Sequence, residues 1–275
     1  MKTMKIFLNG KIVSVNDDFV DRIKPGVLDV PGVFETMLVY NGNIFNLSNH
    51  LKRFKRGLKV FKIRLPYSEK KIIQALQKII RQNNIKHGRI RLSAFKDKNV
   101  TVAIVAKSVK KKSQADYERG YKAYVSSVVR NPKRYSHVKS HYWNLFYIAL
   151  LEARAHKYDE AILLNKNKEI VEGSVSNLFF IKNKTLMTPT ISSGCLNGVT
   201  RNTVISLAQE AGYKVKRGRF KLKSMMGAEE VFMTNSILPI MPIVRIDGQK
   251  IGSGRMGPQT AALLKSYQKK IISEI

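Results

Sequence analysis

Residues 138–153 read VKSHYWNLFYIALLEA, a short polar segment that leads into an apolar run. Six of its side chains recur at helical spacing: Tyr142, Leu145, Phe146, Ala149, Leu150 and Ala153. This spacing predicts a helix that runs to about His156, with Lys139 just before it. Charge alone does not single out Lys139, because the chain holds 50 Lys and Arg residues among its 275 residues.

The chain before this stretch predicts a mixed set of strands and helices. Asn9-Gly10 and Asn41-Gly42 each separate two strand-like runs, as the turns of β-hairpins do. Ser48 is the expected cap of a helix with one apolar stripe. That stripe consists of Leu47, Leu51, Phe54, Leu58 and Phe61. A second helix is expected over about residues 68–83, and strands over 88–95 and 100–109.

The polar stretch KKKSQADYERG interrupts this pattern and marks the best position for a linker. Strands and helices alternate after it, so we predict an α/β (α+β) fold with two domains. A small N-terminal α/β domain is expected over residues 1–112 and a linker over 113–121. A larger C-terminal domain is expected over 122–275, with a helix from Thr200 to Gly212 and another after Pro258.

The composition is that of a folded protein, with 44% hydrophobic residues. No run approaches the roughly 18 apolar residues of a membrane span, and the N-terminus is too polar for a signal peptide. We therefore expect a cytoplasmic protein without a membrane segment. Cys195 is the single cysteine, and the five His residues have no ligand spacing, so we expect neither a disulfide nor a metal site.

The formal net charge of +31 raises the possibility of nucleic-acid binding, because basic surfaces attract phosphate backbones. The basic residues are spread along the whole chain, however, and no known nucleic-acid-binding motif accompanies them. Anionic small-molecule substrates account for the charge more simply. A basic nucleic-acid-binding protein on a degenerate enzyme fold is the alternative from a different class.

Three motifs are weak when each is taken alone. The loop and helix start in GCLNGVTRNTV offers backbone N–H groups to an anion, yet most such starts are only caps. Arg53 beside an apolar stripe is usually solvated, and Glu172 at a strand end is usually exposed. These positions gain meaning only from their order along the chain.

Taken in order, nine segments resemble the fold-type IV pyridoxal-phosphate (PLP) enzymes, which include class IV aminotransferases. The segments are GVFETMLVYNG, HLKRF, VKSHYWNLFYIALLEA, DEAILLN, VEGSVSNLFFI, LMTP, GVTR, AEEVFMTNS and IDGQKIG. The resemblance covers nearly the whole chain. It implies a pseudo-barrel C-terminal domain, PLP as cofactor and a homodimer.

The resemblance also implies a role for each matched residue. Lys139 matches the lysine that holds the cofactor aldehyde as a Schiff base and then moves protons at the substrate carbon. Glu172 matches the carboxylate that keeps the pyridine nitrogen protonated. The other cofactor-binding positions, most of them in the phosphate cup, are Arg53, Val199, Thr200, Asn235 and Ser236.

Within this class, the chain is most similar to 4-amino-4-deoxychorismate lyases, which release 4-aminobenzoate and pyruvate on the way to folate. Phe34 and Thr36 share one face of a strand that looks into the active site in this family. Phe34 stands where D-amino acid aminotransferases have a tyrosine. The string TNSILPIMPI replaces the Gly-Thr-Ala run usual in branched-chain aminotransferases. Both aminotransferases remain alternatives.

Besides Phe34, which is a candidate substrate-binding residue, four residues bear on the substrate in this interpretation. Thr36 is the candidate donor of a proton to the departing group, although threonine is also a common strand residue. Arg89 and Arg91 lie two apart on a strand and could clamp a carboxylate, although exposed strands often carry charge. Pro31 departs from the family pattern before GVFET and would change the backbone there.

Overall fold

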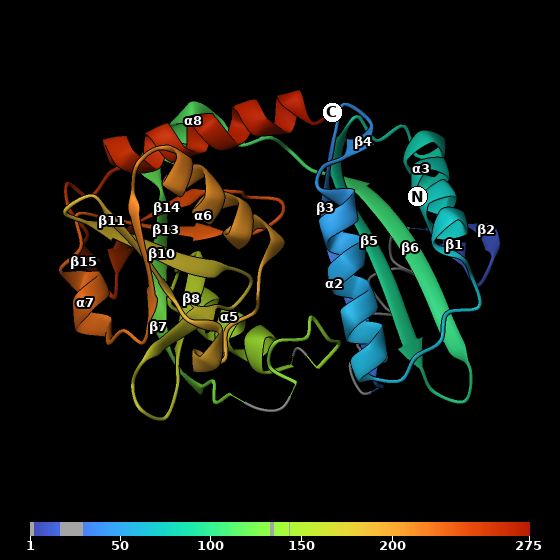
Figure 1. The fold of residues 1–275 in the computed structure, drawn as a ribbon, viewed down its shortest axis with the longest axis horizontal. Helices are drawn as coiled ribbons and strands as arrows, with labels where there is room; N and C mark the ends of the chain where they lie inside the picture. The colour runs from blue at the N-terminus through green and yellow to red at the C-terminus, as the bar shows by residue number, and fades with distance from the viewer. Residues whose placement is uncertain (1–2, 17–29, 133–134, 143) are drawn as a thin grey trace. The chain divides into compact units, whose positions relative to one another are not determined.

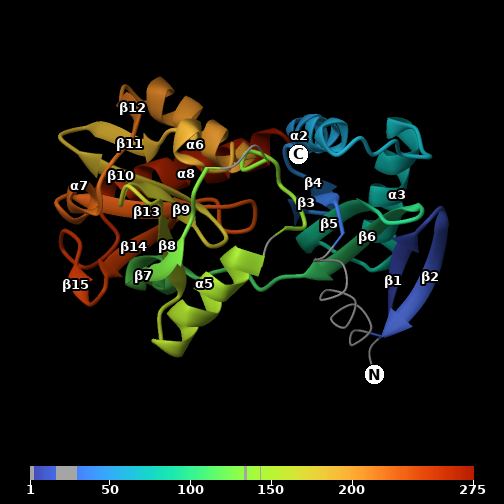
Figure 2. The same cartoon turned by 90° about the horizontal axis from the view of Figure 1, so that it is seen from below.

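The computed structural model describes residues 3–16, 30–132, 135–142 and 144–275. The chain divides into two compact units. The first contains Met1–Lys111, Val138–Trp143 and Ser273–Ile275, and the second contains Lys112–His137 and Asn144–Ile272. Each unit has its own sheet and its own helices (Figures 1 and 2).

The first unit is built on an antiparallel sheet. Its strands are β1 (Thr3–Leu8), β2 (Lys11–Asn16), β3 (Gly32–Tyr40), β4 (Asn43–Ile44), β5 (His87–Lys96) and β6 (Val100–Ser108). They lie in the order β2-β1-β6-β5-β3-β4. Helices α2 (Leu47–Val60) and α3 (Glu69–Gln82) cover one face of this sheet (Figure 1).

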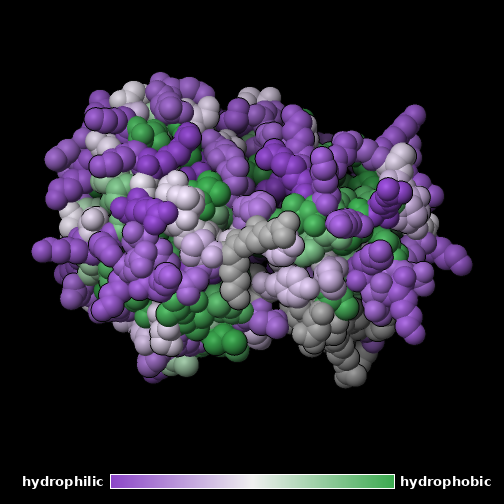
Figure 3. Space-filling model, turned by 60° about the horizontal axis from the view of Figure 1, so that its bottom comes forward, coloured by the Kyte–Doolittle hydropathy of each residue, from purple (hydrophilic) through white to green (hydrophobic). Residues whose placement is uncertain are grey.

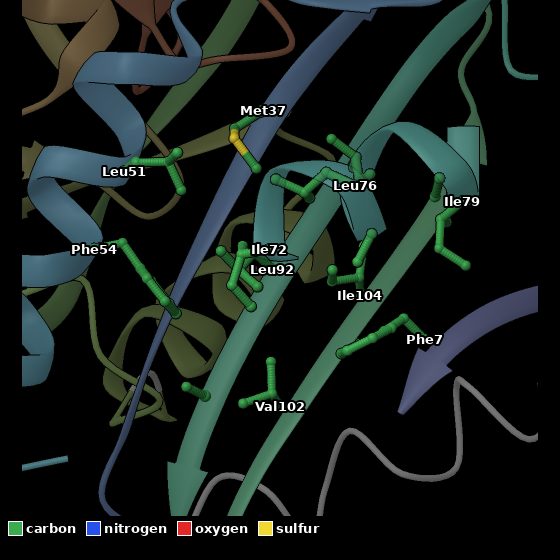
Figure 4. Close-up of a cluster of buried hydrophobic side chains, with 14 of the residues drawn as sticks. Phe7, Met37, Leu51, Phe54, Ile72, Leu76, Ile79, Leu92, Val102 and Ile104 are labelled. Atoms are coloured by element: carbon green, nitrogen blue, oxygen red, sulfur yellow. The ribbon is translucent and has the colours of Figure 1, made fainter. Parts of the chain in front are cut away.

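The core of the first unit fills the space between that face and the two helices. Figure 4 shows Leu51 and Phe54 of α2 and Leu76 of α3 pointing toward Met37 and Leu92 of the sheet. Residues of β3 alternate between this core and the opposite face of the sheet. Phe34 and Thr36 therefore lie on the face opposite to Met37.

The second unit contains a mixed sheet. Its strands are β7 (Tyr121–Val129), β8 (Glu160–Leu164), β9 (Ile170–Gly173), β10 (Asn177–Lys182), β11 (Thr185–Pro189), β12 (Lys214–Gly218), β13 (Glu230–Thr234), β14 (Met241–Ile246) and β15 (Gln249–Lys250). Its helices include α4 (Gln114–Arg119), α5 (Asn144–Ala155), α6 (Val199–Glu210) and α7 (Leu222–Met226), and α8 (Pro258–Ser273) ends the chain. The predicted α/β class is confirmed.

Several predicted elements are confirmed. Asn9-Gly10 joins β1 to β2, and Asn41-Gly42 joins β3 to β4. Ser68 caps α3, its hydroxyl accepting a hydrogen bond from the Lys71 backbone N–H at 3.3 Å. Helix α8 begins at Pro258 after Gly257.

Other boundaries differ from the predictions. Ser48 is not a helix cap: α2 begins one residue earlier, after Asn46 in the left-handed region with φ of 58°. Helix α6 begins at Val199 rather than Thr200. The predicted helix after Lys139 begins only at Asn144. Residues 139–141 instead pair with the start of β3, so their backbone hydrogen bonds go to the strand rather than to a helix.

The two units separate after Lys111, and two later segments of the chain also belong to the first unit. The stretch proposed as a linker contains α4, which Ser113 and Asp116 fix with a reciprocal capping box. It belongs to the second unit, whereas Val138–Trp143 belongs to the first. Lys139 was expected in the C-terminal domain, but its segment pairs with a strand that precedes it by about a hundred positions, which local sequence patterns do not reveal.

Candidate active site

In the first unit, the segment that carries Lys139 is joined to the start of β3. The Phe34 N–H donates to the Lys139 carbonyl at 3.1 Å, and the His141 N–H donates to the Gly32 carbonyl at 2.9 Å. A Cβ atom on Gly32 would lie 2.6 Å from Phe95 Cβ and 2.8 Å from His141 Cδ2, so glycine permits the close approach. The backbone of Lys139 is therefore held against the sheet.

The amine of Lys139 lies next to the ring of Phe34. Its Nζ is 4.6 Å from the centroid of the Phe34 ring, within the range of cation–π attraction. Burial is the main cause that lowers the imidazole pKa of His50, and the charge of Lys139 acts in the same direction. The side chain of Lys139 is half-buried, which is a suitable setting for a reactive amine.

Arg53 lies in a buried ionic cluster on α2 and β3. Its Nε donates to Glu35 Oε1 at 2.8 Å and its Nη2 to Glu35 Oε2 at 2.7 Å. The ring of His50 lies 2.7 Å from the same Oε2 through Nδ1. Arg53 and the hydrogen bonds overcome the effect of burial and lower the pKa of Glu35 to about 2. The role of Arg53 toward a phosphate stays a prediction.

The face of β3 that carries Phe34 and Thr36 continues onto β5. Thr36 lies opposite Arg91 in the register. The guanidinium carbon of Arg91 lies 3.8 Å from the Phe34 ring centroid, and its Nε donates to Ser93 Oγ at 3.4 Å. Burial, helped by the charge of Arg89, lowers the pKa of Arg91 to about 10, so Arg91 stays cationic.

The proposed arginine clamp therefore consists of unequal members. Arg91 is half-buried, whereas Arg89 is exposed and lies opposite Leu38. Within the described ranges, neither arginine pairs with a carboxylate. The half-buried Arg91 beside Phe34 and Thr36 is the better placed of the two for an anionic ligand.

In the second unit, Glu172 lies on β9 and is buried, with 4% of its surface exposed. Its Oε2 accepts a hydrogen bond from the Leu196 N–H at 2.9 Å, and its Oε1 lies 3.6 Å from Arg130 Nε. Arg130 itself donates to the Ser136 carbonyl at 3.3 Å and lies 4.8 Å from the Phe146 ring centroid. Glu172 is therefore an oriented carboxylate with a cation nearby.

The loop after β9 is held by a second buried carboxylate. Glu160 Oε1 accepts from the Ala161 N–H at 2.9 Å and from the N–H of Ser174 at 3.0 Å, and it also accepts from the Ser174 hydroxyl. Glu160 Oε2 accepts from the Ser176 hydroxyl at 2.7 Å. Burial raises the pKa of Glu160 despite these donors. Glu160 thus holds the loop that follows Glu172.

The start of α6 has no side-chain cap. Gly198 occupies the cap position, and no side chain there accepts a hydrogen bond from the first helical N–H groups. Val199 and Thr200, the first two helical residues, are buried. Asn177 fixes the preceding loop by donating to the Leu196 carbonyl at 2.9 Å. An uncapped helix start with its dipole can hold a phosphate.

Asn235 and Ser236 lie in a turn after β13. The Asn235 side-chain oxygen accepts from the backbone N–H groups of Ile237 at 2.9 Å and Leu238 at 2.7 Å. This oxygen therefore shapes the turn. Ser236 is half-buried within that turn, and its expected contact with the cofactor stays a prediction.

The structure thus brings the predicted residues together in two groups. Lys139, Phe34, Thr36 and Arg91 belong to the first unit. Glu172, Val199 and Thr200 belong to the second, where the loop of Leu196 and Gly198 joins Glu172 to the start of α6.

Sequence reasoning missed several residues that hold these groups. Glu35 occupies a strand position that faces the core, and a carboxylate there signals a buried partner. His50 and Arg53 lie one helical turn apart, so both can reach the same carboxylate. No comparable signal marked Arg130 or His141. Among the residues described, no cluster of His, Cys, Asp or Glu could hold a metal ion. None of the described helices is both long and apolar enough to cross a membrane.

Comparison with known proteins identifies the class of enzyme. The family model for class IV amino-transferases matches residues 32–246. The chain therefore belongs to this family, whose members are fold-type IV enzymes that use PLP, and the expected fold type is confirmed.

Three relatives illustrate the activities that occur within that class. The chain is 33% identical to the aminodeoxychorismate lyase of Bacillus subtilis over 97% of this chain and 94% of the relative. It is also 33% identical to a branched-chain-amino-acid aminotransferase of Pseudomonas aeruginosa over 95% of this chain and 91% of the relative. The crystal structure of the Escherichia coli branched-chain amino acid aminotransferase matches with a TM-score of 0.90 and 28% identity, covering 98% of this chain and 95% of that one.

Proposed function

We propose that this protein is a PLP-dependent lyase that converts 4-amino-4-deoxychorismate into 4-aminobenzoate and pyruvate, a step of folate biosynthesis. The observation that carries the proposal is the placement of Arg91 and Lys139 on the same aromatic ring, that of Phe34. A reactive amine beside a half-buried cation suits a substrate that is both an amine and an anion. The similarity to the Bacillus subtilis lyase supports the same choice.

The residues present fit PLP. Lys139 supplies a half-buried amine for the aldehyde, and Glu172 supplies an oriented carboxylate for the pyridine nitrogen. The uncapped start of α6, with Val199 and Thr200, suits the phosphate of the cofactor. We assign Arg53, Asn235 and Ser236 to cofactor binding as well. When bound, the cofactor supplies an electron sink for the carbon that carries the substrate amine.

The protein's own residues move the protons. Lys139 removes the proton from the ring carbon that carries the amine, because its Nζ is the candidate base of the first unit. Thr36 lies opposite Arg91 on neighbouring strands, so its hydroxyl is our candidate donor to the departing enolpyruvyl oxygen. Arg91, assisted by Arg89, binds a substrate carboxylate.

An aminotransferase is the second candidate. Its support is the equal 33% identity to the branched-chain aminotransferase of Pseudomonas aeruginosa. The two reactions share the amine and the cofactor and differ in what leaves the substrate. The lyase needs no amino acceptor, whereas the aminotransferase needs a 2-oxo acid.

A single assay separates the two functions. Purified protein with PLP should release pyruvate and 4-aminobenzoate from 4-amino-4-deoxychorismate without any 2-oxo acid. Transamination of amino acids with no pyruvate release would overturn the lyase proposal. Borohydride should fix the cofactor to Lys139, as peptide mass spectrometry can detect. Lys139→Ala should abolish both results, whereas the exposed control Lys166→Ala should change neither.

We also infer that the protein acts as a cytoplasmic homodimer. Tyr147, Ile148 and Leu151 of α5 are 44%, 56% and 45% exposed, which is high for such residues on one helix. Figure 3 shows hydrophobic side chains gathered on this face within a mostly hydrophilic surface. The single, buried Cys195 suits a reducing compartment. Light scattering should give twice the chain mass, and Ile148→Glu should reduce it to the monomer.

A further inference from the structure

His141 is a buried residue to which the proposed reaction gives no role. Only 3% of its surface is exposed, and it lies two positions after Lys139. Its ring meets the Phe34 ring at 5.4 Å and the Phe95 ring at 5.9 Å, both edge to face. Its backbone is bonded to Gly32, whose missing Cβ leaves room for the ring. The ring is therefore fixed against the same phenylalanine that meets Lys139 and Arg91.

The protonation state of His141 follows from its surroundings. Burial, together with the charge of Arg91, lowers its pKa to about 4, so the ring is neutral at neutral pH. A hydrogen bond to the backbone of Val33 acts in the opposite direction, which means that the ring donates its N–H there. Nε2 is the ring nitrogen that finds no partner among the described residues. Nε2 therefore presents a lone pair and accepts hydrogen bonds only.

An acceptor of this kind is costly to leave unpaired. A buried polar atom without a partner costs about 1–3 kcal/mol, and the N–H groups of Arg91 add to this cost when they lack an acceptor. The hydrogen bond from Arg91 to Ser93 is long, at 3.4 Å. An aliphatic group placed here would leave both His141 and Arg91 unpaired. A polar group that accepts from Arg91 and brings a donor to Nε2 would satisfy both.

We propose that His141 is a specificity-determining residue that, together with Arg91, selects substrates with a polar or anionic group over those with a branched aliphatic group. The donor to Nε2 comes from the group itself or from a water molecule that the group holds. This inference rests on the proposed function to the extent that Lys139 and Arg91 bind one substrate. The inference goes beyond the proposed function because it names His141 as the residue that rejects aliphatic side chains.

Three acids of similar shape test this selection by equilibrium binding to the PLP-loaded protein. Glutarate, its monoamide and 4-methylvalerate share one carboxylate and differ in a terminal carboxylate, carboxamide or isopropyl group. The natural protein should bind the two polar acids about tenfold or more tightly than 4-methylvalerate, which corresponds to one satisfied buried group. In the His141→Leu variant this preference should decrease, although Arg91 is still present, and the affinity for 4-methylvalerate should rise.

The matched control is His141→Gln, whose side-chain oxygen can replace Nε2 as acceptor and should keep the preference to within about threefold. Thermal unfolding of all three proteins should verify the fold. An unchanged preference in His141→Leu, or an equal loss of affinity for all three acids, would overturn the inference. Failure of pyruvate release would instead overturn the lyase reaction, and the ratio of the three affinities would still report on His141.

Discussion

Arg53 of α2 donates two hydrogen bonds to the carboxylate of Glu35 on β3, at 2.8 Å and 2.7 Å, inside the first unit. The fork of the guanidinium matches the two carboxylate oxygens, so the pair fixes the helix to the strand. Phe34, the neighbour of Glu35 on β3, faces the other side of the sheet, where it meets Lys139. The ion pair therefore anchors the strand that carries half of the candidate site.

Removing the charge of Glu35 should destabilise the protein strongly. Glu35→Gln leaves Arg53 with a neutral partner while its side chain is only 12% exposed, and breaking a buried pair costs about 3–5 kcal/mol. Urea unfolding measures the loss. The control is Glu69→Gln, which breaks an exposed pair with Lys55 and should cost less than about 1 kcal/mol. Equal losses in the two variants would contradict the anchoring role.

The same cluster predicts a loss of stability in acid. The pKa of Glu35 falls from 4.5 to about 2 on folding. Its contribution to the unfolding free energy is therefore complete above pH 4.5 and is lost as the pH falls toward 2. Burial also lowers the pKa of His50 from 6.5, so the unfolded chain takes up that proton first, which acts in the same direction. The difference in unfolding free energy between the natural protein and Glu35→Gln should therefore narrow between about pH 4.5 and about pH 2. A gap independent of pH would contradict this assignment.

Glu160 should show the opposite pH dependence. Burial raises the pKa of Glu160 from 4.5. Its contribution to the unfolding free energy is therefore complete below pH 4.5 and declines as the pH rises. Glu160→Gln keeps the shape and the acceptor for the Ser174 N–H, and should change the unfolding free energy at pH 7 by less than about 1 kcal/mol. Relative to the natural protein, this variant should gain stability as the pH rises.

The control for Glu160 is a variant that removes the acceptor. Glu160→Met leaves the N–H of Ser174 and the hydroxyl of Ser176 without their buried partner, and should cost about 2–3 kcal/mol. If Glu160→Gln were as damaging as Glu160→Met, the charge itself would be required. That result would overturn the view that Glu160 acts mainly as a hydrogen-bond acceptor.

The fold could be predicted from the sequence where local patterns decide it. Helix α3 and the Asn-Gly turns of two hairpins depend on residues close together in the chain. The start of α2 was misplaced because Asn46 adopts the left-handed region and leaves Ser48 inside the helix. A serine near a helix start is therefore an incomplete signal.

The candidate site could be predicted only in part. Lys139 and Glu172 were proposed through a resemblance in the order of motifs, because charge and periodicity alone do not distinguish them, and their roles stay predictions. The pairing of the Lys139 segment with β3 joins residues about a hundred positions apart, as does the contact of His141 with Phe34, and the contact with Phe95 is also long-range. The burial that makes His141 an acceptor exists only in the folded chain.

The start of α6 gives the sharpest test of cofactor binding. A Cβ atom on Gly198 would lie 2.1 Å from Asn177 Oδ1, and Asn177 is buried and already bonded to the Leu196 carbonyl. Gly198→Ala must therefore displace the loop or the first turn of α6. Because the Leu196 N–H also holds Glu172, the change should disturb both the helix start and the carboxylate.

We expect Gly198→Ala to weaken PLP binding by about tenfold or more, measured by titrating the cofactor-free protein and following absorbance. Gly227→Ala is the matched control, since Gly227 has an ordinary φ of −88° and its nearest neighbour would lie 3.5 Å from a Cβ atom. It should bind PLP as the natural protein does. Far-ultraviolet circular dichroism should be the same for both variants. If Gly198→Ala keeps full affinity while folded, the start of α6 does not hold the phosphate, and the assignment of Val199 and Thr200 falls with it.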